Sequence, residues 1–225
     1  MRKFTILLFA LCFCFSTVVN AQVTENTKEK TSKHQKIENT RLAYQLIKYG
    51  YQKENALSMI SAIDILLKQN ISDLHLEIDN LNQIEVEVKN YAYLKNILDY
   101  ARYKAKNNVN MLALVDQYDK ELFKMKTTRG AIGGARVGNH TVLAKGSNFF
   151  WVVFKQNELA EVSVIGNGKN VLDLFIYDEN NLLVDKDNKR QAECYLNWYP
   201  KEKKAYKIKI KNNGSSKINY SVITN

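Results

Sequence analysis

The sequence predicts an α+β protein in which about four helices precede an antiparallel β-sandwich, or jelly roll, of about eight strands. Three observations predict this order. Apolar residues recur at helical spacing between residues 36 and 126, glycines gather in residues 127–135, and short alternating runs fill residues 136–225. Short alternating runs separated by turn residues are typical of antiparallel sandwiches.

The helical region contains four apolar stripes. The first helix is expected to begin near Ile37, and Gly50 predicts its end because glycine commonly terminates helices. A second helix is expected over residues 53–69, which makes the pair an antiparallel hairpin. The others are expected over residues 91–105 and 111–124, and either Asn108 or Asn110 can cap the last one. Residues 71–89 are ambiguous and are interpreted as a connecting arm that is strand in part.

A glycine-rich segment separates the two halves. Three glycines within residues 130–134 predict a hinge at 127–135, so the β-sandwich is expected to fold without the helices. Turn residues, including Asn213-Gly214, separate the strands of the second half. The strands are expected at residues 136–144, 148–155, 160–165, 171–177, 182–184, 192–198, 205–211 and 217–223.

The start of the chain is typical of an export signal. Residues 1–21 have a basic start, a short apolar run and small residues before position 22, so cleavage is expected between Ala21 and Gln22. Residues 22–35 are polar and predict a flexible lead-in. No later stretch approaches 18 consecutive apolar residues, so no transmembrane segment is expected in the mature chain. The predicted location is the periplasm or the extracellular space.

Charge and cysteine content narrow the function classes. The net charge of +10 is spread along the chain rather than concentrated, and we predict no nucleic-acid partner. Cleavage would leave Cys194 as the single cysteine, which excludes an internal disulfide. An exposed thiol is a liability in an oxidising compartment, so Cys194 is expected to be buried.

One run of lysines is a candidate contact surface. Lys207, Lys209 and Lys211 alternate with apolar residues, which places the three lysines on one face of a strand. Such a face could meet an anionic glycan or an outer-membrane surface. Lysines also protect edge strands from aggregation, and we favour that interpretation.

A group of aromatic residues gives a second, weaker candidate, a carbohydrate platform that includes Phe149, Phe150, Trp151, Tyr195, Trp198 and Tyr199. Alternation places Cys194, Leu196 and Trp198 on one strand face, which is expected to be core. Tyr195 and Tyr199 lie on the other face and are a candidate contact surface for carbohydrate.

Metal-ligating residues form no complete motif. Asp185, Asp187 and Asn188 offer alternating oxygen ligands in a predicted turn, which makes them a weak calcium candidate, although a solvated polar turn is favoured. His34 precedes Glu38 by four residues and shares its helical face, but two ligands do not make a metal site. No other cofactor is predicted. His140 is expected at the surface.

The second half also resembles a known family. The runs LDLFIYDEN at 172–180, CYLNW at 194–198, YKI at 206–208 and NYSV at 219–222 resemble the bacterial pre-peptidase C-terminal domain over residues 137–225. The resemblance implies a small β-sandwich attached to a secreted protein, usually a peptidase. Some members of that family bind fibrous proteins or calcium.

These observations favour a non-catalytic interaction module, because the chain contains no catalytic motif and no peptidase domain beside the sandwich. Its expected partner is an envelope component, a glycan or a secreted protein. The alternative is a protease-associated accessory factor or a small secreted hydrolase, which would bring a nucleophile and a histidine or acid pair together in a cleft.

Overall fold

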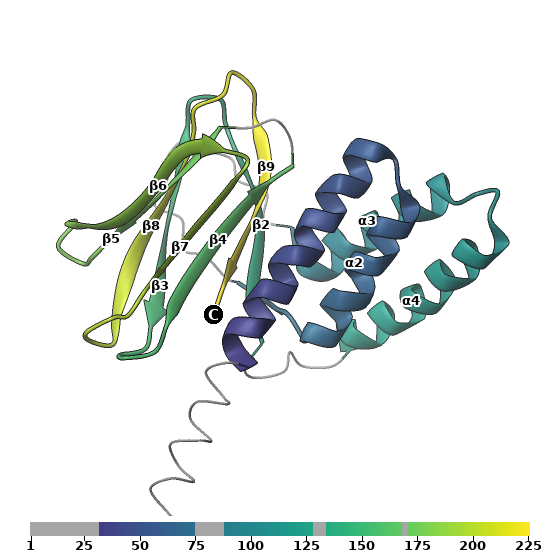
Figure 1. Ribbon diagram of the computed structural model, residues 1–225, viewed down its shortest axis with the longest axis horizontal. Helices are drawn as coiled ribbons and strands as arrows, with labels where there is room; N and C mark the ends of the chain where they lie inside the picture. The colour runs from purple at the N-terminus through teal and green to yellow at the C-terminus, as the bar shows by residue number, and fades with distance from the viewer. Residues whose placement is uncertain (1–31, 75–87, 128–133, 168–170) are drawn as a thin grey trace, which may run out of the picture.

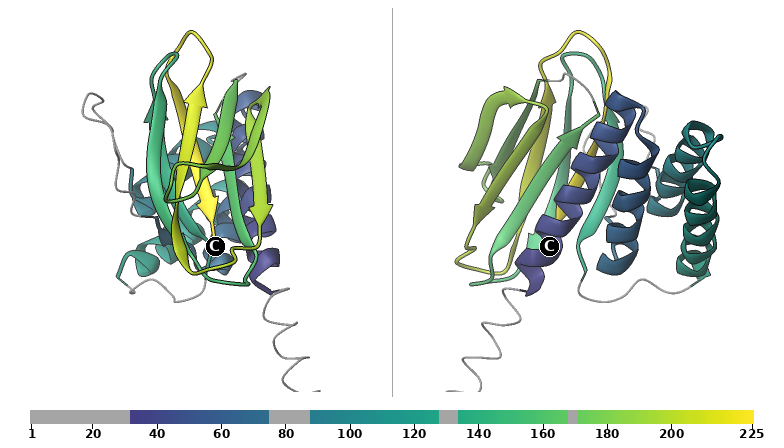
Figure 2. Two further views of the ribbon diagram at one scale, coloured as in Figure 1. Left: turned by 90° about the vertical axis from the view of Figure 1, so that its left-hand side faces the viewer. Right: turned by 45° about the vertical axis from the view of Figure 1, so that its right-hand side comes forward.

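The computed structural model describes residues 32–74, 88–127, 134–167 and 171–225, which form three layers (Figure 1). One layer is helical, and the other two are β-sheets stacked face to face. Figure 2 shows that the described helices lie on the side of one sheet only. The α+β class, with helices preceding a β-sandwich, is confirmed.

The helical layer begins with a helix over residues 32–53, called here the 32–53 helix. It is followed by α2 (Ala56–Gln69), α3 (Asn90–Lys104) and α4 (Val109–Thr127). Asn55 caps α2 by accepting a hydrogen bond from Ser58 N at 2.9 Å, and Asn108 accepts one from Met111 N at 3.0 Å at the start of α4. None of the described helices combines the length and apolarity that crossing a bilayer requires.

Two expectations for the first helix are wrong. Residues 32–35 are helical rather than part of a lead-in, because Lys33 and His34 contact the β-sandwich. Gly50 does not end the helix, which continues to residue 53. A Cβ atom at position 50 would lie 2.5 Å from Met59 Cγ of α2, so the glycine permits close packing of the two helices.

The sheet that faces the helices is called sheet A and has the strand order β1-β2-β9-β4-β7. The outer sheet, sheet B, has the order β3-β8-β5-β6. The strand bounds are β1 Ser72–Asp73, β2 Arg136–Val142, β3 Ser147–Phe154, β4 Ala160–Gly166, β5 Leu172–Tyr177, β6 Leu183–Gln191, β7 Glu193–Trp198, β8 Lys204–Asn212 and β9 Ile218–Thr224.

Strand β9 holds the centre of sheet A. It pairs antiparallel with β2 on one side and with β4 on the other. The short β1 extends the sheet by pairing parallel to β2, so the arm interpreted from residues 71–89 does contain a strand. Eight expected strands are present, but the expected short strand at 182–184 is β6, which continues to Gln191.

Two clusters of buried residues stabilise the layers. The inner faces of the two sheets enclose one of them, which includes Phe150, Leu174 and Val222. The other joins the helices to the outer face of sheet A through Val137, Ile165 and other residues. Strand β4 is buried along its whole length, because it contributes to both clusters.

Some predictions fall on residues that the structure does not describe. The signal peptide, its cleavage position at Ala21 and Gln22, and residues 22–31 of the lead-in lie outside the described residues. The same holds for residues 75–87 of the arm and residues 128–133 of the hinge.

Candidate functional site

The three candidate lysines lie in the middle of a sheet. Lys207, Lys209 and Lys211 belong to β8, which pairs with β3 on one side and with β5 on the other. The interpretation of an edge strand protected by lysines is therefore wrong. The face predicted for them is correct, because Tyr206, Ile208 and Ile210 point into the core between the sheets.

Aromatic residues flank these lysines on the outer face of sheet B. In the strand register, Lys209 lies between Phe149 of β3 and Phe175 of β5. Lys207 lies in the next row, between Trp151 of β3 and Tyr177 of β5. We call these six residues, which are all half-buried, the Lys/aromatic face.

The lysine ammonium groups lie over the rings. Lys209 Nζ is 5.4 Å from the ring centroid of Phe149 and 5.6 Å from that of Phe175. Lys207 Nζ is 5.1 Å from the centroid of Phe149 and 5.9 Å from that of Trp151. Cation–π attraction of this kind holds the lysines down on the sheet and keeps their charge at its surface. The face can therefore offer flat apolar rings and positive charge to one ligand.

The sequence indicated the lysines of this face and included Phe149 and Trp151 among its aromatic candidates, but it did not connect the two groups, and it missed Phe175 and Tyr177. Phe149 and Trp151 precede β8 by more than fifty positions, and Phe175 and Tyr177 precede it by about thirty. Their alternation with buried residues was a usable signal, because it puts each pair on one strand face. Which strands lie beside β8 could not be read from that alternation.

The two candidate tyrosines do not form a common surface. Tyr199 follows β7 and is 63% exposed. Tyr195 faces the 32–53 helix, where Arg41 covers its ring. The core assignment of Cys194 and Leu196 is confirmed, and Trp198 packs at the border of the same core against Phe154 and Tyr206.

The weak calcium candidate lies in a different setting from the one expected. Asp185, Asp187 and Asn188 belong to strand β6 rather than to a turn, because β6 pairs with β5 along this stretch. The Asp185 carboxylate accepts a hydrogen bond from Lys186 N, and that of Asp187 accepts one from Tyr195 N. The two carboxylates thus bind backbone amides, one in β6 and one in β7.

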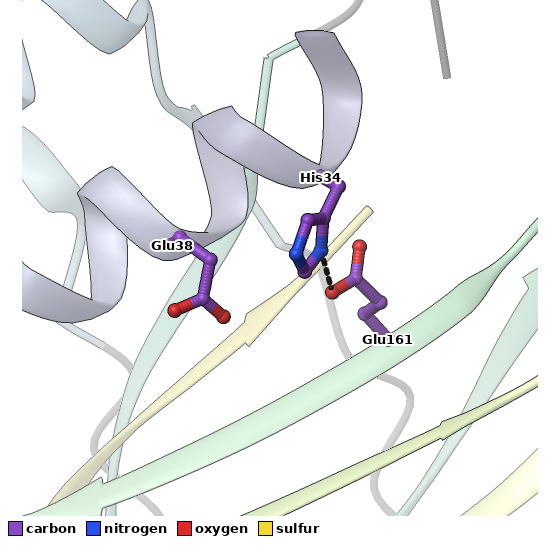
Figure 3. Close-up of side chains that lie close together, drawn as sticks. All are labelled: His34, Glu38 and Glu161. Carbon is purple, nitrogen blue, oxygen red and sulfur yellow. Dashed lines mark hydrogen bonds and ion pairs between the residues drawn. The ribbon is translucent and has the colours of Figure 1, made fainter. Parts of the chain in front are cut away.

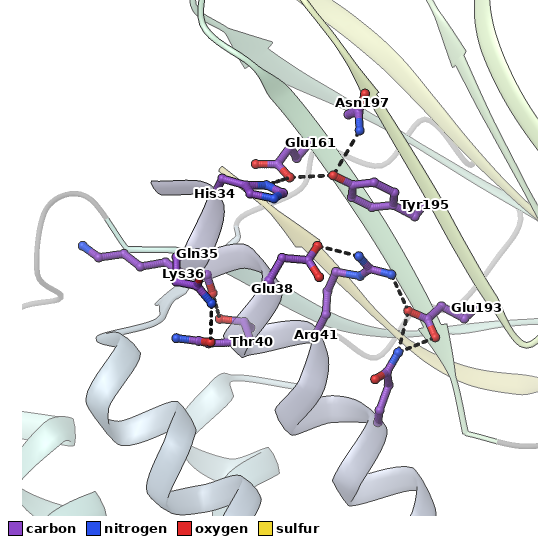
Figure 4. A network of polar contacts seen from close by, with 12 residues as sticks. His34, Gln35, Lys36, Glu38, Thr40, Arg41, Glu161, Glu193, Tyr195 and Asn197 are labelled. Carbon is purple, nitrogen blue, oxygen red and sulfur yellow. Dashed lines mark hydrogen bonds and ion pairs between the residues drawn. The ribbon is translucent and has the colours of Figure 1, made fainter. Parts of the chain in front are cut away.

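A network of polar side chains joins the 32–53 helix to sheet A. His34 Nδ1 lies 2.8 Å from Oε1 of Glu161 in β4 (Figure 3). Tyr195 of β7 donates to the same oxygen at 2.6 Å. Arg41 donates to Glu38 at 2.6 Å and to Glu193 at 2.9 Å (Figure 4).

The tyrosine of this network remains a hydrogen-bond donor at neutral pH. Burial raises the pKa of Tyr195 to about 12, and its hydrogen bond to Glu161 acts in the same direction. The phenol is therefore protonated at neutral pH and can donate to the carboxylate of Glu161. Sequence analysis missed this network, since Glu161 lies 127 positions from His34.

A cavity of about 600 Å³ lies further along the same junction. Its lining includes Tyr44, Lys48 and Tyr93 from the helices and Asn139 and Ser221 from sheet A. Burial raises the pKa of both Tyr44 and Tyr93 well above the usual range, so both phenols stay neutral. The polar groups here bind one another: Asn139 Oδ1 accepts hydrogen bonds from Ser221 Oγ at 2.8 Å and from Tyr44 at 3.4 Å.

His140 is buried, so its expected position at the surface is wrong. Only 3% of the residue is exposed, because its side chain points from β2 into the space between the sheets. There its ring lies 6.4 Å from that of Phe150 and 5.9 Å from that of Tyr220, measured between centroids.

Comparison with known proteins assigns no family to the chain. No protein-family model matches the chain, and no curated protein sequence matches it. Solved structures similar to the C-terminal part include a mitogen from Yersinia pseudotuberculosis, with 15% identity and a TM-score of 0.33, covering 40% of this chain and 84% of that one.

Two further solved structures match this chain with comparable TM-scores. PliG, a periplasmic inhibitor of g-type lysozyme from Aeromonas hydrophila, is 9% identical, with a TM-score of 0.33, covering 43% of this chain and 90% of that one. The pre-peptidase C-terminal domain of a Bacillus anthracis collagenase is 12% identical, with a TM-score of 0.31, and the match covers 40% of this chain and 87% of that one. The resemblance read from the sequence therefore has a distant structural match over part of the chain and no matching family model.

Proposed function

We propose that this protein is an exported, non-catalytic binding module whose Lys/aromatic face holds an acidic glycan. The observation that carries the proposal is the pair of cross-strand rows in sheet B. Each row places one lysine between two aromatic rings, as Lys209 lies between Phe149 and Phe175. The expected signal peptide supports export, where acidic polysaccharides of an envelope would be the accessible partners.

The chemistry of the face fits a charged sugar chain. Aromatic rings present apolar surface on which the C–H faces of sugar rings can stack. Lysine ammonium groups attract carboxylate, sulfate or phosphate substituents at moderate range, and salt screens this attraction over about 8 Å at physiological ionic strength. Binding should therefore be weak for neutral sugars and should decrease as salt is added.

The mutational test compares two pairs of lysines. The double variant Lys207→Gln, Lys209→Gln removes two charges from the face, and Lys201→Gln, Lys203→Gln removes two from the exposed loop before β8. Binding to an acidic polysaccharide such as heparin should decrease at least tenfold in the first variant and change little in the second. Equal losses in the two variants would show that only net charge matters and would overturn the proposal.

A second experiment tests whether the aromatic rings stack on the ligand and which class of ligand binds. Trp151→Ala should weaken binding of acidic glycan at a salt concentration that already screens the lysines. Single-stranded DNA serves as a competitor, because aromatic rings beside cations also bind nucleobases. Tighter binding to the DNA than to every acidic glycan tested would contradict the proposal.

The alternative of a small hydrolase gains no support from the junction cavity. A hydrolase would need a nucleophile within hydrogen-bond reach of a base. Ser221 and His140 both line the cavity, yet their side chains leave opposite faces of sheet A. Ser221 Oγ donates instead to the amide oxygen of Asn139.

A further inference from the structure

Three metal-ligating side chains converge where the 32–53 helix crosses β4. They are His34 and Glu38 from the helix and Glu161 from the strand (Figure 3). One nitrogen or oxygen atom from each lies within 4.8 Å of the others. Three ligands around one ion lie about 3 to 3.5 Å apart when each bond is about 2.1 Å long, so these atoms would have to approach one another by at most about 2 Å.

The fold itself brings the three together. His34 and Glu38 are four residues apart, so they lie on one helical face one turn from each other. Glu161 belongs to the face of β4 that points to the helix, since Val162 and Val164 point into the core between the sheets. The cluster therefore joins two layers of the protein.

The carboxylate of Glu161 is buried, and its described side-chain partners are His34 and Tyr195. Its side chain is 1% exposed, whereas that of His34 is 46% exposed. An ionised carboxylate is costly to bury unless a cation or several hydrogen bonds compensate it. Among the described ion pairs of this junction, Lys33 pairs with Glu158 at 3.3 Å, and Arg41 pairs with Glu38 and Glu193.

Neighbouring side chains hold the ligands in place. The Tyr195 hydroxyl donates to Glu161 Oε1 at 2.6 Å and itself accepts from Asn197 Nδ2 at 3.2 Å. Arg41 donates to Glu38 Oε1, which leaves the second oxygen of that carboxylate for another partner. Hydrogen bonds of this kind orient carboxylate ligands in metal sites.

The geometry points to a site for a divalent transition-metal ion, with His34, Glu38 and Glu161 as its protein ligands. An imidazole nitrogen with two carboxylate oxygens is a donor set that Zn²⁺ and similar ions accept. Three protein ligands leave at least one position for water. The exposure of His34 gives the ion a path from solvent.

An ion held there would fasten the 32–53 helix to β4. Binding only to the folded arrangement stabilises the folded state in proportion to the logarithm of the free ion concentration. The site would thus strengthen the junction between helices and sandwich independently of any ligand on the Lys/aromatic face.

Calorimetric titration with Zn²⁺ tests the site on the protein from Gln22 onward, free of affinity tags. One ion should bind per chain and raise the thermal unfolding midpoint. The variant His34→Gln should bind Zn²⁺ at least about tenfold more weakly. The variant Tyr195→Phe should bind it about 10-fold to 100-fold more weakly, because residues that hydrogen-bond to metal ligands typically contribute that much to metal affinity. The matched control Glu158→Gln removes a carboxylate at the same junction and should bind like the wild type.

Cobalt absorption in the wild type provides a test that does not depend on variants. Bound Co²⁺ should give visible bands of nitrogen and oxygen coordination without the near-ultraviolet thiolate band that Cys194 would produce. A thiolate band, no binding of Zn²⁺, or unchanged affinity in the variant His34→Gln, Glu38→Gln would each overturn the inference.

Discussion

The guanidinium of Arg41 lies over the ring of Tyr195, with Cζ 4.3 Å from the ring centroid. The same guanidinium donates to two carboxylates, one on its own helix and one on β7. One side chain thus joins the helical layer to the edge of sheet A by charge, hydrogen bonds and ring contact together.

Replacing Arg41 with alanine should destabilise the fold more than removing an exposed ion pair. Its side chain is 17% exposed, and a hydrogen bond to a charged group contributes about 1.5–3 kcal/mol, so a loss of about 2–3 kcal/mol is expected in urea unfolding. The matched control is Arg102→Ala in α3, which also pairs with two carboxylates, Asp116 and Asp119. That exposed pairing should contribute about 1 kcal/mol or less. Equal losses would contradict the role of Arg41 at the junction.

Gly50→Ala should destabilise the helical layer through Met59. The added methyl group would overlap the Met59 side chain, and overpacking of this kind costs about 1–3 kcal/mol. A double-mutant cycle in chemical denaturation checks the cause, because Met59→Ala removes the overlapping atoms. The cost of Gly50→Ala should be smaller in that background, and an unchanged cost would point to the backbone instead.

Cys194 should react slowly with thiol reagents until the protein unfolds. The residue is 1% exposed, and its Sγ donates to Leu172 O at 3.3 Å. Burial raises the pKa of this thiol to about 12, so the reactive thiolate is scarce in the folded state. Stopped-flow labelling at pH 8 measures the rate, with urea-unfolded protein as the reference. Equal rates in the two states would refute burial.

The raised pKa of the Cys194 thiol predicts that the free energy of unfolding decreases at alkaline pH. Its pKa is higher in the folded state than its ordinary value of 9.0, so folding favours the protonated thiol. The stabilisation of the folded state by the protonated thiol is fully present below pH 9 and decreases as the pH rises towards 12. The stability difference between the wild type and Cys194→Ala should therefore shrink between pH 9 and pH 12. A difference that stays constant over that range would contradict it.

The β-sandwich without its helices should be unstable. A chain of residues 134–225 would expose Val137, Ile165 and Ile223, which are all buried beneath the helices. It would also lose β1 and the partner of Glu161. Circular dichroism and sedimentation should show aggregation or a lower unfolding midpoint than for residues 32–225. Cooperative unfolding at an equal midpoint would support the independent folding that the glycine-rich segment predicts.

Local patterns predicted much of the fold. Strands β3 to β5 and β7 to β9 follow from alternation, because period 2 separates core from surface whichever strands lie alongside. The first residues of the 32–53 helix are polar and are held to the β-sandwich by ion pairs such as Lys33–Glu158. Because they form no apolar stripe, hydrophobic periodicity could not predict that they are helical. The helix end predicted at Gly50 was wrong because this glycine permits close packing against Met59 and does not terminate the helix.

The candidate sites depend on relationships that no local pattern contains. Alternation placed Lys209 on a strand face, but only the pairing of β8 with β3 and β5 puts Phe149 and Phe175 beside it. The sequence also showed that His34 and Glu38 share a helical face. Their third partner, Glu161, is supplied by the packing of that helix on β4.

The central position of β9 has a consequence for biosynthesis. A ribosome makes β9 after every other described strand, and until then β2 and β4 lack the neighbour that joins them. A nascent or prematurely terminated chain therefore holds sheet A in two separate pieces, with the surface that the helices should cover still divided. Sheet A can therefore close only after β9 has left the ribosome, and a chain that ends before β9 cannot complete it.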